Sequence, residues 1–423
     1  MFRLKRFYFL AISSITFFTL VIFLNIKTEA ASCATNILFV PGNFLKASGI
    51  NFSYMGQRVC LYGATIYTSG GSATIPSCGN PPGGSWSNSS FTNRIDWDLC
   101  MAQQAHLNFI RVTNYADSSS SNPEDAATWS NIDYLISQAQ KKGMFILMDL
   151  SSYAKHLESK NINPYDIAED SGWQQFISFV TNRVNSYTNV AYKNTPNIAY
   201  YSVRGEVNPV GSSFPSSTTQ GYLDFYSRTT NGIFSNDQNH LIEAGGLTHL
   251  NQSNSGIPWQ QIFGLPHVSI ASIHVYSANR LDPINGSNDL NQTLPAVSAW
   301  ARQDNKPFDI QEYGLVNQLG DSQRASAMQT IIARAVSFGV ASLVYWNLGP
   351  ETTSGMHYDV NSNFPLSWQA FIQGASTFFG SQSQDTQEVA TATPTTAQAP
   401  IINSSLGVPI KLTGIGNGTI KEN

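Results

Sequence analysis

Two glutamates, each placed where an apolar segment ends, are the residues of this sequence best suited to chemistry. Glu206 follows the apolar residues 200–203, and Glu312 closes the segment 307–312. Two carboxyl groups can divide the cleavage of a glycosidic bond, because a protonated one can protonate the leaving oxygen while an ionised one attacks the sugar carbon. We therefore predict that Glu206 and Glu312 form such a catalytic pair.

Four further side chains stand near the ends of other apolar segments. Arg111 is a cation that can hold a carboxylate ionised. His274 and Tyr276 are two residues apart, so the alternation of a strand directs both to one face, where they can order a carboxylate. Trp346 offers a flat ring on which a sugar can stack. The histidines form no metal-ligand pattern, so we predict neither a catalytic metal nor another cofactor.

Short apolar segments alternate with amphipathic ones between residues 57 and 380, which predicts strands alternating with helices. In one such unit, Thr128 is the expected N-cap of a helix, Gly143 ends it, and residues 144–148 form the next strand. The same pattern recurs from Asp321 to Trp346. Eight strands are expected in all, at residues 59–66, 107–113, 144–150, 198–203, 241–244, 268–274, 307–312 and 341–346.

Eight strands with intervening helices predict an α/β fold, a (β/α)8 TIM barrel. No Gly-rich phosphate loop follows the first strand, which argues against an open doubly wound sheet. Residues 37–55 are predicted to form a small β-hairpin that closes the lower end of the barrel. In such barrels the C-terminal strand ends carry the site, and this is where the polar residues named above stand.

The two ends of the chain differ in composition from residues 37–380, which we assign to the barrel. Residues 1–30 carry basic residues, then a long apolar run, then small residues, which predicts a signal peptide, with an uncleaved N-terminal anchor as the alternative. Residues 381–423 form a predicted linker and disordered tail, because residues 381–400 are 17 of 20 Ser, Thr, Gln, Ala or Pro.

All four cysteines lie within the first hundred residues, and their spacing matches no zinc motif. An exported chain can oxidise them, so we predict one or two disulfides that staple the N-terminal loops. Without residues 1–30, 19 basic and 26 acidic side chains remain, a net charge of −7. This charge does not favour nucleic acid as a partner. The cysteines are Cys33, Cys60, Cys78 and Cys100.

The chain resembles glycoside hydrolase family 5, and clan A more broadly, which holds cellulases and β-mannanases. The resemblance covers most of residues 37–380 and rests on motifs in a fixed order: Arg111, residues 205–209 (Gly-Glu-Val-Asn-Pro), 274–276 (His-Val-Tyr), 310–314 (Ile-Gln-Glu-Tyr-Gly) and Trp346. It implies that Glu206 is the acid/base and Glu312 the nucleophile. It also implies supporting or substrate-binding roles for Arg111, Asn208, His274, Tyr276 and Trp346.

Two departures from the family indicate an outlying member. The family carries an Asn immediately before its acid/base, where this chain has Gly205. Its third strand ends near a His, for which Asp149, Tyr153 and His156 are the candidate replacements here.

Arg204 is a third unusual residue. Strand alternation is expected to set it one layer beneath Glu206, where a cation would lower the pKa of the acid. The alternatives are that Arg204 turns elsewhere or pairs with another carboxylate.

The leading hypothesis is a secreted retaining β-glycoside hydrolase, of endo-β-mannanase or endo-β-1,4-glucanase type, that acts on a β-linked polysaccharide. One alternative is a non-catalytic cell-surface carbohydrate-binding protein on the same barrel. Another is a transglycosylase that remodels wall glycan. We expect a monomer outside the cell or at its surface, with attachment to membrane or wall through the termini as a further option.

Overall fold

The computed structural model describes residues 33–67, 71–112, 122–207, 218–248, 250, 256–276, 290–353, 355 and 357–381. The predicted signal peptide, residues 1–30, lies outside the described residues. So do Asn208 and residues 382–423 of the predicted tail. Among the helices that are described, none has the length and apolar content needed to cross a membrane.

Eight parallel strands form the wall of a barrel, as predicted. In spatial order they are Leu241–Glu243 (β8), Ile198–Ser202 (β7), Phe145–Asp149 (β6), Phe109–Val112 (β5), Leu61–Ile66 (β4), Ser342–Leu348 (β11), Phe308–Gly314 (β10) and Ala271–Val275 (β9). Isolated parallel bridges, Glu243 with Ile270 and Leu247 with Ile273, join the first and last of these segments and nearly close the ring.

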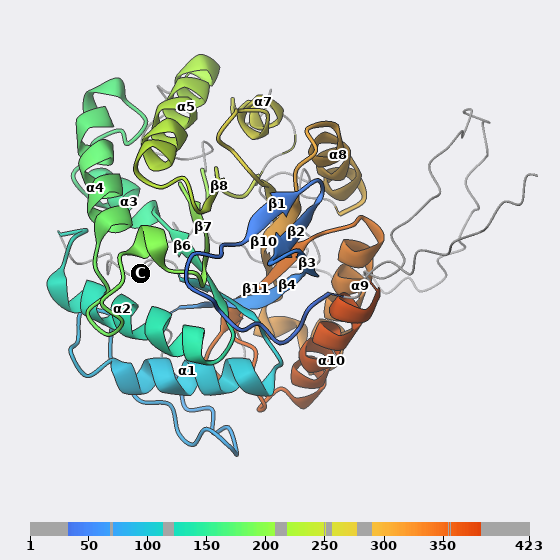
Figure 1. Ribbon diagram of the computed structural model, residues 1–423. Helices are drawn as coiled ribbons and strands as arrows, with labels where there is room; N and C mark the ends of the chain where they lie inside the picture. Colours follow the sequence, from blue (N-terminus) through green and yellow to red (C-terminus); the bar gives the residue numbers. More distant parts are fainter. Residues whose placement is uncertain are drawn as a thin grey trace, which may run out of the picture. The chain divides into compact units, whose positions relative to one another are not determined.

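Helices surround the barrel strands (Figure 1) and cover their outer faces. Almost every residue of these strands is buried. The outer faces of the strands pack on the apolar sides of these helices, as where Trp173, Phe176 and Val180 of α4 are buried. The described helices are α1 (Thr92–Gln104), α2 (Ala126–Lys141), α3 (Ser151–Ser159), α4 (Asp170–Asn182), α5 (Thr219–Asn236), α7 (Trp259–Phe263), α8 (Leu290–Gln303), α9 (Asp321–Ser337) and α10 (Pro365–Ser381).

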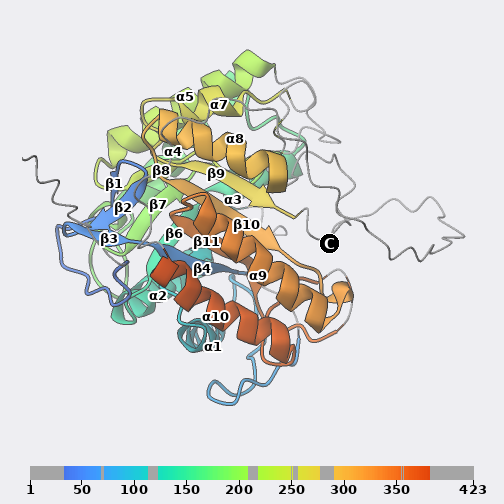
Figure 2. The same cartoon turned by 90° about the vertical axis from the view of Figure 1, so that its right-hand side faces the viewer.

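A small antiparallel sheet covers one end of the barrel (Figure 2). It has three strands, Lys46–Ser48 (β1), Asn51–Tyr54 (β2) and Gln57–Val59 (β3), so the predicted hairpin of residues 37–55 gains a third strand. Val59 pairs with Phe52 of β2 rather than starting the first barrel strand, because the chain reverses again at residues 55 and 56. Phe52 packs in one cluster with Phe109 and Phe145, which begin barrel strands, so the sheet covers the N-terminal strand ends.

The N-cap predicted at Thr128 lies three residues earlier, and helix α2 starts at Ala126. Its N-cap is Asp125, whose Oδ2 accepts hydrogen bonds of 2.8 Å from both the backbone N and the hydroxyl of Thr128. A carboxylate at this position satisfies a helix amide that would otherwise lack a partner, and a threonine three residues later cannot. The predicted end is confirmed, because Gly143 has a φ of 72° and follows the last turn.

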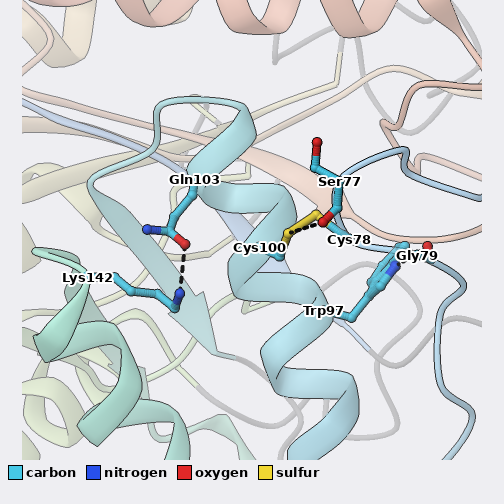
Figure 3. The surroundings of a disulfide bond; sticks show 7 residues. All are labelled: Ser77, Cys78, Gly79, Trp97, Cys100, Gln103 and Lys142. Atoms are coloured by element: carbon cyan, nitrogen blue, oxygen red, sulfur yellow. Dashed lines mark hydrogen bonds between the residues drawn. A yellow bond between two sulfur atoms is a disulfide. The ribbon is translucent and has the colours of Figure 1, made fainter.

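The four cysteines form two disulfides, Cys33–Cys60 and Cys78–Cys100, which confirms the predicted pairing of N-terminal loops. The second ties the segment before α1 to that helix (Figure 3). Beside it, the Trp97 indole N–H donates a 3.0 Å hydrogen bond to the carbonyl of Gly79. The disulfide and this bond together hold a segment that has little regular structure of its own.

One irregularity in β10 changes which side chains reach the interior. The pairing of β10 with β9 shifts between Ile310 and Glu312, which marks a β-bulge at Gln311. In a regular strand Gln311 and Glu312 would point to opposite faces. Here both make hydrogen bonds inside the barrel, to His274 and to Tyr276 respectively.

Candidate active site

The two predicted catalytic glutamates meet at the C-terminal ends of the barrel strands. Glu206 follows β7 and forms a parallel bridge with Gly246, and Glu312 belongs to β10. One carboxylate oxygen of each lies within 4.8 Å of the other, and both oxygens lie within the same distance of a ring nitrogen of His274. The Glu206 side chain is 41% exposed, whereas that of Glu312 is only 7% exposed. One carboxyl therefore faces solvent and the other is enclosed.

Arg111 of β5 holds the buried glutamate from one side. Its Nη1 contacts Glu312 Oε1, and its Nη2 donates a 2.8 Å hydrogen bond to Asp149 Oδ2. Burial lowers the pKa of the guanidinium, but the charges of Glu312 and Asp149 outweigh burial and raise it above its ordinary value. Arg111 thus stays charged and places a cation against the Glu312 carboxyl group.

Tyr276, just after β9, holds Glu312 from the other side. Its hydroxyl donates a 2.5 Å hydrogen bond to Glu312 Oε2. Burial raises the pKa of Tyr276 well above its ordinary value, and the charges of Glu312 and Glu206 raise it further, so the phenol remains a donor. Gly314 makes room for this ring, since a Cβ there would lie 2.3 Å from it.

His274 of β9 bridges the two carboxyl groups. Its Nδ1 lies 2.6 Å from Glu206 Oε1 and 3.3 Å from Glu312 Oε2. Burial lowers the pKa of His274, but the charge of Glu312 and the hydrogen bond with Glu206 outweigh it and raise the pKa. For Glu206, burial raises the pKa, and the hydrogen bond and charge of His274 more than offset this. Both shifts favour the charged forms, so the proton between Nδ1 and Glu206 is drawn toward the imidazole.

Trp346 of β11 is half-buried at the same end of the barrel. Its ring lies 5.4 Å from that of Tyr67 and 5.8 Å from the guanidinium carbon of Arg111. The peptide bond between Trp346 and Asn347 is cis. The indole is thus placed beside the ion pair of Arg111 and Glu312.

The replacements considered for the missing third-strand His separate in the structure. Asp149 enters the site through Arg111. Tyr153 instead packs on Phe176 and Trp173 of α4, and its hydroxyl lies against Gly172. His156 packs near Tyr153 at 6.2 Å between ring centroids. Only Asp149 of the three contacts the residues around Glu312.

Arg204 does not lie beneath the Glu206 carboxylate, so that expectation is wrong. Its Nη2 donates a 2.6 Å hydrogen bond to Glu158 Oε1, and its Nε donates one of 2.7 Å to the backbone oxygen of Glu206. Regular alternation fails here because the chain has already left β7, which ends at Ser202. The cation therefore holds the backbone of Glu206 and pairs with another carboxylate, as one of the alternatives foresaw.

Sequence reasoning gave no role to several polar residues that the structure brings to this region. Lys155 of α3 is half-buried and interacts electrostatically with Glu206, Glu312 and Asp149. Burial lowers its pKa, and the nearby carboxylates only partly offset this. Its one signal in the sequence was its place one turn into the helix that follows the third strand. The others, all fully buried inside the barrel, are Ser202, Glu243, Asp309 and Gln311.

The closeness of Glu206, His274 and Glu312 raises the question of a metal ion. Both oxygens of Glu312 already accept hydrogen bonds, from Arg111 and Tyr276, and His274 Nδ1 contacts Glu206. A metal cation would have to compete with the Arg111 guanidinium for the same oxygens. This donor set fits a supported carboxyl pair, and the absence of a catalytic metal stays a prediction.

Comparisons with known proteins agree with this architecture. A family model described as cellulase (glycosyl hydrolase family 5) matches residues 67–352. Among solved structures, the endo-1,4-beta-mannanase from Rhizomucor miehei aligns with a TM-score of 0.61 at 18% identity, covering 79% of this chain and 99% of that one. The beta-glucanase from Saccharophagus degradans, solved with cellotetraose, aligns at 0.52 and 14% identity, covering 80% and 95%.

At such low identities the structural matches show a shared fold and no more. No curated protein sequence matches this chain. The family match spans the segment from the end of the first barrel strand to just beyond the last, and it contains both glutamates and every residue that holds them. The chain is a member of glycosyl hydrolase family 5.

Proposed function

We propose that this chain is a secreted, retaining β-glycoside hydrolase that cuts within a β-linked polysaccharide, of endo-β-mannanase or endo-β-1,4-glucanase type. The observation that carries the proposal is the separation of the two carboxyl groups. Retaining enzymes hold them about 5 to 5.5 Å apart, and inverting enzymes about 6.5 to 9.5 Å apart to leave room for a water. Glu206 and Glu312 offer oxygens within 4.8 Å of each other, which favours retention.

The surroundings of each glutamate fit the division of roles. Glu312 is enclosed, contacts the Arg111 guanidinium and is held by Tyr276, so one carboxylate lone pair is positioned to attack the anomeric carbon. Glu206 is solvent-accessible and shares a proton with His274, so it can protonate the leaving oxygen as the glycosidic C–O bond breaks. Glu206 then takes a proton from the water that releases the sugar from Glu312, which restores both groups.

The aligned structures support the substrate class, and the disulfides and the N-terminal segment support secretion. The aligned structures carry the names of mannanases, mannosidases and a glucanase, which supports a β-linked glycan of mannose or glucose. Two disulfides and the predicted signal at residues 1–30 support secretion. N-terminal sequencing of the exported protein tests the signal, because an anchored form would retain residues 1–30.

The test of the function uses purified protein with β-mannan and β-1,4-glucan. We expect reducing-sugar release from at least one polymer, and NMR of the first product should show retained β configuration. Glu312→Gln should abolish release, because the nucleophile's charge is lost while its shape remains. Asp224→Asn, the same carboxyl-to-amide change at an exposed position on α5, is the matched control and should keep full activity.

Three outcomes would contradict the proposal. Binding of the polymers without any cleavage would make the chain a carbohydrate-binding protein. Longer oligosaccharides without net hydrolysis would make it a transglycosylase. Ordinary turnover by Glu312→Gln would show that the nucleophile is another group.

A further inference from the structure

A buried hydrogen-bonded chain runs from the acid/base down into the barrel. The imidazole of His274 sits on the side chain of Gln311, whose Oε1 lies 2.7 Å from His274 Nε2. The amide nitrogen of Gln311 donates to Ser202 Oγ at 2.8 Å and to Glu243 Oε2. All four side chains are fully buried. Each contact is therefore made away from bulk water, where the identity of donor and acceptor matters most.

The partners of Gln311 fix which way round its amide lies. The Ser202 hydroxyl donates its own hydrogen to the carbonyl of Arg204, at 3.4 Å, so it accepts from Gln311. Glu243 Oε2 is an acceptor as well. The amide nitrogen therefore faces these two groups, and the amide oxygen faces His274. An amide oxygen only accepts, so Nε2 of His274 must carry a hydrogen.

Glu243 is in turn held by a second buried acid, Asp309 of β10. Tyr200 donates a 2.8 Å hydrogen bond to Asp309 Oδ2, and Asp309 and Glu243 interact with each other, with Ser342 beside Asp309 and Ser272 beside Glu243. Burial and the neighbouring charge of Asp309 raise the pKa of Glu243 well above its ordinary value. A proton shared between the two acids leaves Glu243 Oε2 free to accept from Gln311.

We propose that Gln311, oriented by Glu243 and Ser202, locks His274 in its Nε2–H form, so that Nδ1 is the only nitrogen that exchanges a proton with Glu206. This inference rests on the proposed function and adds positioning residues to it. When a sugar covers the site, the Nδ1–H bond breaks and an O–H bond forms at Glu206 Oε1. The imidazole is left neutral, and Glu206 becomes the acid.

The surroundings of His274 support this role. A Cβ at residue 246 would lie 1.9 Å from the imidazole Cδ2, so Gly246 lets the ring lie flat against the backbone. The charged groups that face the ring are Glu206 after β7, Glu312 of β10 and Arg111 of β5. Glu206 and Glu312 contact Nδ1, whereas Nε2 meets the uncharged Gln311. The neutral contact keeps Nε2–H from being drawn away as pH rises.

The first test reads the tautomer directly, without substrate, so its result does not depend on hydrolysis. Long-range 1H–15N spectra of the intact protein with labelled histidine show which ring nitrogen carries hydrogen, and loss of a signal in His274→Gln assigns the residue. His240, which is buried with its Nδ1 2.6 Å from Asp237, serves as an internal reference. We expect His274 Nε2 to stay protonated as Nδ1 titrates. A bare Nε2 beside a protonated Nδ1 would overturn the proposal.

Two substitutions of Glu243 separate hydrogen bonding from packing. Glu243→Gln mimics the protonated acid, since its oxygen can accept from Gln311 and its NH2 can donate to Asp309, so the tautomer should be unchanged. Glu243→Met keeps much of the volume but lets Gln311 rotate, and a mixture of tautomers should appear. If Glu243→Met fails to fold, Gln311→Leu makes the same test, because it leaves Nε2–H without an acceptor. Identical spectra for all variants would contradict the proposal.

The second readout compares two leaving groups. Gln311→Leu should lower kcat/KM by up to about 10²-fold for a poorly leaving alcohol, which needs the acid, and only slightly for an activated aryl glycoside. A merely structural role would lower both equally, and that result would count against the proposal. If no glycoside is cleaved but the tautomer is as expected, the proposed function fails and the locking of His274 stands.

Discussion

Arg111 and Asp149 form a buried ion pair directly beneath Gly205, with 2.8 Å between Arg111 Nη2 and Asp149 Oδ2. A Cβ built on Gly205 would lie 2.6 Å from that nitrogen and 3.0 Å from that oxygen. Ser151 completes the contact, because its hydroxyl accepts a 2.7 Å hydrogen bond from the Gly205 amide. The ion pair occupies the space that a side chain at residue 205, directly before Glu206, would need. This explains why residue 205 is a glycine.

This arrangement predicts the effect of restoring the family residue. Gly205→Asn should lower both activity and stability, because the new side chain must push Arg111 Nη2 away from Asp149 and so shift the guanidinium that also contacts Glu312. The cost of overpacking is about 1 to 3 kcal/mol in the free energy of unfolding, measured by urea denaturation. Gly205→Ala should show a smaller change in the same direction. An increase in kcat/KM for Gly205→Asn would refute this account.

The effect of replacing Glu206 should depend on the leaving group of the substrate. Glu206→Gln should lower kcat/KM for polysaccharide by roughly 10² to 10⁴-fold, the usual contribution of a general acid. An activated aryl glycoside needs no proton to depart, so its first step should be nearly unaffected. The measurement is steady-state and burst kinetics on both substrates. Equal losses on the two would move the acid role to another residue.

The pairing of His274 with Glu206 should contribute to stability over a defined range of pH. The pKa of His274 is raised above its ordinary 6.5, so its contribution is present below 6.5 and is lost as pH rises through the raised value. The pKa of Glu206 lies below its ordinary 4.5, so its contribution is present above 4.5 and is lost as pH falls through the lowered value.

Denaturation of the wild type and Glu206→Gln across this range checks the sign. The difference in unfolding free energy between them should be largest between pH 4.5 and 6.5 and shrink on both sides. A difference that grows steadily toward alkaline pH would contradict the ionic pairing.

The disulfide between Cys78 and Cys100 should stabilise the fold without serving the chemistry. It closes a loop with a sequence separation of 22, for which loss of the crosslink costs about 3 kcal/mol through the entropy of the unfolded chain. The double variant Cys78→Ser, Cys100→Ser should unfold at lower urea but keep its kcat/KM at low temperature. Loss of activity in the folded variant would show that this segment shapes the site.

Much of the barrel could be predicted from the sequence because its signals are local. Apolar segments that alternate with segments of helical periodicity predict the strands. A polar residue at the end of such a strand lies at the C-terminal face of the barrel, whatever the rest of the chain does. Glu206, Glu312, Arg111, His274 and Tyr276 were found in this way, and the structure brings all five together. Asn208 lies outside the described residues, so its role stays a prediction.

Other features are decided only by the tertiary structure. The bulge at Gln311 sends two consecutive side chains inward, which a strict period of two forbids, and it arises from pairing with β9. The exit of Arg204 toward Glu158 and the close fit of Gly205 over Arg111 depend on helix α3 and strand β5. The sequence by itself determined the strands and the polar residues at their ends. The hydrogen-bond partner of each side chain was decided by contacts between segments far apart in the chain, because a hydrogen bond requires distances and angles that only packing supplies.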